Sequence, residues 1–274
     1  MKVLIPTDFS NSAKVAFDFA YQLFSGFENV TFFLLNSYEM PSTGSAGGVM
    51  MNLEEAMKKE SENDLKIELR ELKEKFTGIN ITSVSRYGTL ENSVSRTNNE
   101  EKIDFVVMGT HGASGLKKAL IGSNTMKIIE NSEVPIISVP VGWEYREIKN
   151  IVYATDLKRL ENVESLKPLC VLAEKFNSTI HIVYVSDNEN EIDLENEVSK
   201  LPLNKMFAKR ERKFKVIHSK NVADSIDNYV AEINADMTVL IPKVSSFWDK
   251  LFNRSVTVQM AFHTKVAMLS IRDM

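Results

Sequence analysis

The chain has 274 residues, a hydrophobic fraction of 43% and a charged fraction of 26%, which is typical of a globular protein with a sizeable core. The length favours two domains, and the formal net charge of −4 gives no electrostatic reason to expect a nucleic acid partner. No apolar run reaches the roughly 18 residues of a membrane span, the start lacks the apolar region of a signal peptide, and the single Cys170 excludes an intramolecular disulfide. We therefore expect a cytoplasmic protein without a membrane or nucleic acid partner.

Strands and helices are predicted to alternate along the first half. The strands are expected at Val3–Pro6, Thr31–Asn36, Ile79–Arg86, Phe105–Met108 and Pro135–Val139. The helices are expected after the cap residue Ser10 or Asn11, in the charged stretch that contains Leu65, Leu69 and Leu72, near Leu90–Glu100, and from Ser123. Glu39–Asn52 is rich in Ser and Gly and is expected to be a flexible connection. Short, wholly apolar strands that alternate with helices predict an α/β fold with a parallel sheet covered on both faces.

The second half repeats the first at two constant offsets. At an offset of 148 residues, Lys2–Asp8 matches Asn150–Asp156 and Thr31–Ser37 matches Thr179–Val185. At an offset of 132 residues, Asp104–Met108 matches Asp236–Leu240 and Val134–Ser138 matches Val266–Ser270. The offset changes after the second strand, where the second half lacks the Ser/Gly-rich connection. Constant offsets over most of the chain indicate a tandem duplication, with one domain at residues 1–145 and another at 146–274.

The stretch GTHGASGLKKALIGSNT, Gly109–Thr125, follows the fourth strand of the first half. Glycines are used where the backbone must turn or approach another group closely, and ligands of parallel sheets bind beyond the carboxyl ends of the strands. The free N–H groups of a helix that begins at Gly122-Ser123-Asn124 predict a phosphate site, to which the Ser123 and Thr125 hydroxyls could add hydrogen bonds. Each glycine alone would be ordinary turn punctuation, and the spacing fits neither a Walker A loop nor GxGxxG.

With these features the chain resembles a tandem member of the universal stress protein family. In that family G-2x-G-9x-G-(S/T) marks the ATP-binding subtype, and Gly109, Gly112, Gly122 and Ser123 match this motif. The resemblance implies two doubly wound, parallel, five-stranded sheets of the Rossmann-like, adenine-nucleotide hydrolase-like type. It also implies a regulatory role in the stress response and one ATP or other adenine nucleotide in the first domain, with or without Mg²⁺.

The resemblance also assigns site residues by position. Pro6, Thr7 and Asp8 would contact adenine and ribose, and the backbone of Ser37 would lie against the base. Ser37 departs from the family, in which this position is usually apolar. The ribose and the phosphates would be held by Met108, Gly109, His111, Gly112, Gly122, Ser123, Asn124 and Thr125.

The second half departs from the motif. Its residues at the three glycine positions and at the position of Pro6 are Ile241, Val244, Arg254 and Ala154, and Phe247, Trp248 and Phe252 lie in the same loop. Only Asp156, Ser255 and Thr257 persist. Large side chains replace a bare backbone, so we predict a degenerate second domain that binds no nucleotide. An anion or a smaller ligand held by Arg254 is the alternative.

Hydrolysis of ATP would need a catalytic base, and usually Mg²⁺, near the terminal phosphate. Asp8 and His111 are the only nearby candidates for this base, and the resemblance places Asp8 at the nucleoside. We therefore expect a nucleotide-binding protein whose hydrolysis, if any, is slow. The alternatives are an interaction protein that binds no nucleotide and an ATP-dependent enzyme of the adenine-nucleotide hydrolase-like group.

The last strand of each half is an apolar edge that invites pairing. We predict that Ile136–Val141 and Met268–Ile271 pair antiparallel within the chain, which would make the monomer a pseudo-twofold copy of a family dimer. Pro140 has no N–H to donate and should mark the end of this pairing. Further homodimerisation through another surface is left open.

Overall fold

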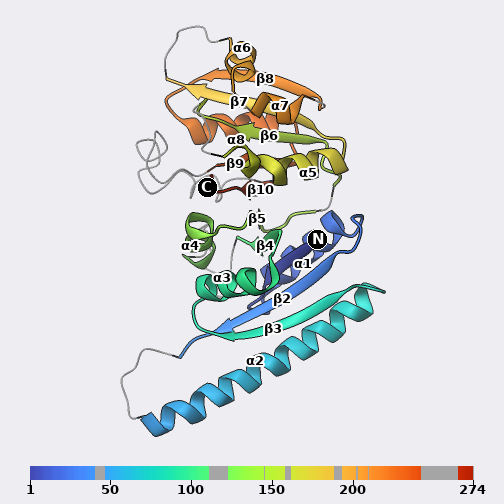
Figure 1. Cartoon of the computed structure of the whole chain (residues 1–274), viewed down its shortest axis with the longest axis vertical. Coiled ribbons are helices and arrows are strands. Elements are labelled where there is room, and N and C mark those ends of the chain that lie inside the picture. The colour runs from blue at the N-terminus through green and yellow to red at the C-terminus, as the bar shows by residue number, and fades with distance from the viewer. Residues whose placement is uncertain are drawn as a thin grey trace. The chain divides into compact units, whose positions relative to one another are not determined.

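The computed structural model describes residues 1–40, 47–110, 123–144, 146–157, 162–187, 193–201, 203–208, 210–241 and 265–273, without the side chains of residues 47–52, 123, 124 and 203. The chain divides into two compact units (Figure 1). Unit 1 contains Met1–Lys117 and Gly122–Val134, and unit 2 contains Lys118–Ile121 and Pro135–Met274.

Unit 1 contains a parallel sheet with the strand order β3-β2-β1-β4. The strands are β1 (Lys2–Pro6), β2 (Thr31–Tyr38), β3 (Ile81–Tyr87) and β4 (Phe105–Gly109), and the helices are α1 (Asn11–Phe24), α2 (Gly47–Lys75), α3 (Leu90–Glu101) and α4 (Ser123–Asn131). The helices α1 and α2 lie side by side, joined by ion pairs of Lys14 with Glu71 and of Lys75 with Asp18. The helices α3 and α4 pack against each other.

Helix α1 begins where the sequence predicts it, directly after the cap residue Ser10. Ser10 is the N-cap, and its hydroxyl accepts a hydrogen bond from the N–H of Ala13 at 3.3 Å. Such a cap satisfies one of the backbone N–H groups that the first turn leaves without a partner. The apolar row of this helix is buried, as expected from its helical spacing: Ala13, Ala16, Phe17, Ala20 and Phe24.

Helix α2 begins at Gly47, inside the stretch predicted to be a flexible connection. The residues VMMN after the two glycines include Met, which favours helix, and no Pro, so the helix extends back through them. Of the remainder of the predicted connection, Glu39 and Met40 follow β2 without regular structure, and residues 41–46 lie outside the described residues. Figure 1 shows α2 as one continuous helix alongside β3. It buries Leu65 and Leu72 and leaves Leu53 exposed.

Unit 2 contains the strand order β5-β10-β9-β6-β7-β8. Its strands are β5 (Ile136–Val139), β6 (Asn150–Ala154), β7 (Thr179–Ser186), β8 (Arg212–His218), β9 (Met237–Leu240) and β10 (Ala267–Ser270). Its helices are α5 (Lys167–Lys175), which follows a 3-10 turn at Val163–Leu166, α6 (Leu194–Ser199), α7 (Leu203–Phe207) and α8 (Val222–Glu232). Four neighbouring pairs in this order are parallel: β10 with β9, β9 with β6, β6 with β7, and β7 with β8.

The predicted antiparallel pairing of the two last strands is confirmed. Ser138 of β5 lies opposite Met268 of β10, and Ile136 lies opposite Ser270. Pro140 directly follows β5 and takes no part in this ladder. Because of the pairing, β5 belongs to the second compact unit, although by sequence it is the last strand of the first repeat.

The duplication is also visible in the backbone. The residues other than Gly that have positive φ in the described part of the chain form three pairs at the sequence offsets: Phe9 with Leu157, Asn29 with Asn177, and Lys102 with Asn234. Such residues are uncommon, so their pairing is not expected by chance.

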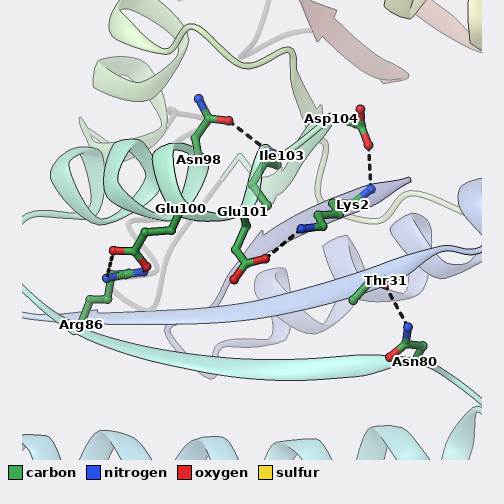
Figure 2. Close-up of polar contacts among 9 residues, drawn as sticks. All are labelled: Lys2, Thr31, Asn80, Arg86, Asn98, Glu100, Glu101, Ile103 and Asp104. Carbon is green, nitrogen blue, oxygen red and sulfur yellow. Dashed lines mark hydrogen bonds and ion pairs between the residues drawn. The ribbon is translucent and has the colours of Figure 1, made fainter.

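Equivalent aspartates also hold the start of the first strand in each repeat. The Asp104 carboxylate accepts a hydrogen bond from the N–H of Lys2 at 2.7 Å, and Asp236 accepts one from the N–H of Asn150 at 2.9 Å. Figure 2 shows Asp104 directed to the start of β1, where the Lys2 ammonium also contacts Glu101 at 2.9 Å. The two repeats thus share local geometry as well as sequence.

Candidate functional site

The turn after β1 is the first part of the predicted site. Thr7 is only 5% exposed, and its N–H donates to the carbonyl of Leu35 at 2.8 Å. Its hydroxyl accepts a hydrogen bond from the N–H of Phe9 at 3.0 Å, and the Asp8 carboxylate accepts one from the N–H of Ser10 at 3.2 Å. Phe9 has a φ of 63°, in the left-handed region that bulky residues rarely adopt. The turn is therefore strained and held by its own hydrogen bonds.

A buried polar network supports this turn. The Thr7 hydroxyl donates to the Glu68 carboxylate of α2 at 3.1 Å, and the Asn36 amide donates to the Thr7 carbonyl at 2.8 Å. The Ser61 hydroxyl donates to the Asn36 side-chain oxygen at 2.7 Å and lies 2.7 Å from the Ser85 hydroxyl. Sequence reasoning missed this network. The signal was available, because Glu68 stands three residues after Leu65 and four before Leu72, on the stripe of α2 that faces the sheet.

The environment of Glu68 shifts its titration. Burial is the largest effect and raises the pKa of the Glu68 carboxyl above its usual range, and the nearby Glu71 and Asp8 add to this rise. The hydrogen bond from Thr7 and the charge of Lys14 act in the opposite direction. A buried carboxyl group with a raised pKa is thus hydrogen-bonded to Thr7, one of the predicted site residues.

Gly109 ends β4 and has a packing reason that the sequence did not reveal. A Cβ atom at this position would lie 2.2 Å from the Ser12 hydroxyl oxygen and 2.8 Å from the Ser12 carbonyl oxygen. The glycine therefore lets α1 approach β4 closely, whereas we expected it to make room for a ligand. Met108, the residue before it, is buried in the sheet.

Thr125 links α4 to β4. Its hydroxyl is buried and donates to the carbonyl of Gly109 at 3.3 Å. Ser123 and Asn124 form the first turn of α4, but their side chains lie outside the described residues. His111, Gly112 and Gly122 also lie outside them. The structure thus brings the β1 turn, the end of β4 and the start of α4 into one unit without describing the loop between β4 and α4.

A cavity of about 270 Å³ lies at the carboxyl end of β2 in unit 1. It is lined by Ser37, Glu39, Thr89, Leu90, Glu91 and Lys127, which come from β2, the segment after it, the start of α3, and α4. Thr89 is the N-cap of α3 and accepts a hydrogen bond from the N–H of Asn92. The volume is close to the roughly 300 Å³ at which small-molecule pockets begin. Ser37 is the predicted site residue that this cavity contains.

A much smaller cavity of unit 2 lies at the turn that follows β6. A cavity of about 10 Å³ is lined there by Ala154, Thr155, Asp156, Val183, Val185, Val222 and Ile226. This volume is about that of one water-sized probe. Val185 and Val222 stand at the positions of Ser37 and Leu90, and Ile241, at the position of Gly109, is buried. Val244, Phe247, Trp248, Phe252, Arg254, Ser255 and Thr257 lie outside the described residues.

Unit 2 also contains a larger cavity, of about 1000 Å³, away from the predicted site. Its lining comes mainly from α8 and from residues near the start of the second repeat, such as Trp143 and Arg146. None of the predicted site residues lines it. The strand β4 and the helix α4, which flank the glycine motif, belong to unit 1.

The sequence model of the universal stress protein family matches residues 1–140. The chain belongs to the universal stress protein family. It is 28% identical over 139 residues to universal stress protein MJ0531 of Methanocaldococcus jannaschii, covering 50% of this chain and 81% of that relative. Universal stress protein MJ0577 of the same organism is 24% identical over 151 residues, covering 50% of this chain and 93% of that relative.

A crystal structure shows the same fold over the whole length. A universal stress protein from Archaeoglobus fulgidus DSM 4304 matches 99% of this chain and 96% of its own, with a TM-score of 0.68 and 16% sequence identity. The predicted family and the predicted α/β fold are therefore confirmed. In the described part of the chain, no helix is both long and apolar enough to cross a membrane.

Proposed function

We propose that this universal stress protein binds one adenine nucleotide, ATP being the first candidate, in the crevice of unit 1. The observation that carries the proposal is the position of the glycine motif in the sheet. The strand β1 pairs with β2 on one side and with β4 on the other, so the strand order reverses between β1 and β4. Ligands of doubly wound sheets bind at this point, beyond the carboxyl ends of the strands. The motif begins at the carboxyl end of β4.

The nucleoside would lie against Pro6, Thr7 and Asp8, with the base near Ser37 and the adjoining cavity. The Thr7 hydroxyl is already bonded to Phe9 and Glu68, and its N–H donates to Leu35. Thr7 would therefore contact the nucleoside through its carbonyl oxygen, which accepts from Asn36 and keeps a second lone pair. Met108 and Gly109 would line the ribose. The start of α4 offers free N–H groups and a positive helix end, which attract phosphate. His111, Gly112, Gly122, Ser123, Asn124 and Thr125 complete this assignment, with or without Mg²⁺.

The protein would act as a regulatory, nucleotide-dependent factor of the cytoplasm, with slow hydrolysis at most. The second repeat would bind no nucleotide, because large side chains replace the motif glycines in its sequence and Val185 replaces Ser37. Turnover is therefore expected to fall far below the roughly 1–1000 per second that is usual for enzymes.

One observation favours a second candidate, an interaction protein that binds no nucleotide. The hydroxyls of Thr7 and Thr125 are both used inside the protein, which leaves them with less capacity to bind a ligand.

Two measurements distinguish these candidates. Mass spectrometry of small molecules released from the purified, heat-denatured protein should identify an adenine nucleotide. Calorimetric titration of the stripped protein with ATP, ADP, AMP and GTP should then show one site per chain. Two equivalent sites would contradict the assignment to unit 1, and the absence of saturable binding would favour the second candidate.

A further inference from the structure

Glu68 differs from the other charged residues of α2. Of those that the structure describes, it alone is buried, with 5% of its surface exposed. Its carboxylate reaches the turn after β1, where it accepts the hydrogen bond from the Thr7 hydroxyl. A charged group is buried at a substantial cost unless it has hydrogen-bonding partners, so this placement calls for a specific role.

The carboxylate fixes the orientation of the Thr7 hydroxyl. A threonine hydroxyl has one proton to donate and two lone pairs to accept with. The N–H of Phe9 uses a lone pair, and Glu68 takes the proton. The hydroxyl thus joins the strained residue Phe9 on one side to α2 on the other.

A second route also connects α2 to Thr7. Ser61 lies two helical turns before Glu68 on the same buried stripe and donates to the Asn36 side chain. The Asn36 amide in turn donates to the Thr7 carbonyl. Both the side chain and the backbone of Thr7 are therefore held by contacts that lead to α2.

The second repeat builds the same turn with a different partner for its threonine. The Thr155 hydroxyl accepts a hydrogen bond from the N–H of Leu157 at 3.1 Å, and Leu157 has a φ of 58°. The side chain of Thr155 is also hydrogen-bonded to Tyr153 of β6, and Tyr184 replaces Asn36. Asp156 of this turn has a buried carboxylate oxygen, but within the described residues no carboxylate accepts a hydrogen bond from the Thr155 hydroxyl. A carboxylate bonded to this threonine is seen in the repeat that carries the glycine motif.

From this contrast we propose that Glu68 is a positioning residue of the nucleotide site. Through Thr7 it fixes the turn against which the nucleoside lies, and it couples α2 to the occupancy of the site. The inference rests on the proposed function. Asp8 of the turn, Lys14 of α1 and Glu71 of α2 are the charged groups near Glu68, and it is Glu68 that accepts the proton of the Thr7 hydroxyl.

The test compares two substitutions of Glu68 with one exposed control on the same helix. Glu68→Gln keeps an oxygen that accepts from Thr7 and should bind ATP within about twofold of the wild type. Glu68→Leu leaves the buried Thr7 hydroxyl without an acceptor and should weaken ATP binding by about fivefold or more. A fivefold loss of affinity corresponds to the lower end of the free-energy cost of an unsatisfied buried hydroxyl. Glu71→Gln, one turn away and exposed, should bind ATP like the wild type.

A second measurement separates positioning from a loss of folding. In the wild type and in Glu68→Gln, ATP should slow hydrogen exchange of the α2 amides between Ser61 and Leu72, and in Glu68→Leu this effect should be lost. If Glu68→Leu is poorly folded, Thr7→Val combined with Glu68→Leu removes both partners. That double variant should recover part of the thermal stability without recovering affinity, since the N–H of Phe9 still lacks its acceptor.

The outcomes separate the two proposals. If the wild type binds no nucleotide, the proposed function fails and the role of Glu68 fails with it. If the wild type binds ATP and Glu68→Leu binds equally well, only the role of Glu68 is wrong. If Glu68→Leu and Glu68→Gln lost ATP affinity equally, the charge of Glu68 and not its hydrogen bond to Thr7 would support binding. That result would also overturn the inference.

Discussion

The two repeats differ most at the crevice beyond their first strand. Both keep the strained turn, with Thr7 and Thr155 in the same role and positive φ at Phe9 and Leu157. Near it, unit 1 has a polar cavity of about 270 Å³ that Ser37 lines, whereas Val185, at the position of Ser37, lines a cavity of about 10 Å³ in unit 2. The comparison shows that both repeats form the turn, and we propose that the capacity to bind a nucleotide depends on the residues around it.

The repeats also differ in which buried polar side chains form networks. In unit 1 the network of Thr7, Asn36 and Glu68 lies at the carboxyl ends of the strands. In unit 2 the buried His181 contacts the Tyr229 hydroxyl at 2.9 Å and the Asn150 side chain at 3.1 Å, near the amino ends of β6 and β7.

The largest expected effect comes from copying a residue of the second repeat into the first. Gly122→Arg places the side chain of Arg254 at the proposed phosphate site and should weaken ATP binding at least about a hundredfold, as for the loss of about two charge-assisted hydrogen bonds. The fold should remain, because the second repeat carries Arg at the equivalent position. Calorimetry and circular dichroism check the two expectations.

The matched control for this variant is Arg254→Gly. It should not create a second ATP site, because Ile241 and Val244 still replace two motif glycines and Val185 still replaces Ser37. Binding of ATP by Gly122→Arg with wild-type affinity would show that the phosphate assignment is wrong.

The next effect concerns the strand that pairs the repeats. A fragment of residues 1–145 retains β5 but loses β10, its antiparallel partner. An apolar strand with unpaired N–H and C=O groups should then pair with another copy. Light scattering should give about twice the fragment mass or larger aggregates, with the full chain at the same concentration as the control. A stable, soluble monomer of the fragment would contradict this role of the pairing.

A smaller effect is expected on the pH dependence of stability, to which the buried His181 of unit 2 should contribute. Burial, with a contribution from Lys213, lowers the pKa of His181, whereas Glu211 acts in the opposite direction. The folded state then favours neutral His181, while the unfolded chain takes up a proton near pH 6.5. The contribution of neutral His181 to the free energy of unfolding is therefore fully present above about pH 6.5. It is lost as the pH falls toward the pKa of His181 in the folded state, by up to about 1.4 kcal/mol per pH unit.

His181→Phe tests this prediction, because Phe33 occupies the equivalent position of the first repeat. Urea unfolding between pH 5 and pH 7.5 should show a smaller pH dependence in the variant than in the wild type. The absolute stability is expected to fall, since Tyr229 and Asn150 lose a partner. Identical pH dependence in the two proteins would mean that His181 does not titrate differently in the folded state.

The smallest expected effect concerns the cavity of unit 1. Lys127 lines it from α4 and is exposed, so Lys127→Met should weaken nucleotide binding by only about two- to fivefold, as is usual for an exposed charge. The loss should diminish at high salt, because salt screens exposed charges. Lys66→Met, on the exposed side of α2, is the matched control. Unchanged affinity in Lys127→Met at low salt would place the ligand elsewhere in the crevice.

The sequence alone determined the elements and their repetition. The alternation of apolar strands with helices, the Ser10 cap and the two offsets are local or periodic features, which require no knowledge of contacts. They predicted the fold, the resemblance that includes the glycine motif predicted the family, and the apolar last strands predicted the pairing of β5 with β10. Residue bounds were less well predicted at α2, where helix-favouring residues extend the helix into the expected connection.

The tertiary structure decided why particular residues stand at the site. Gly109 is required by Ser12 of α1, Thr125 donates to Gly109, and Glu68 supports Thr7 from 61 residues away. Each of these contacts joins segments that are far apart in the sequence. Sequence periodicity shows which face of a helix is buried, but it does not show what that face meets. The chemistry behind the crevice therefore follows only from the packing of α1, α2 and α4 against the strands.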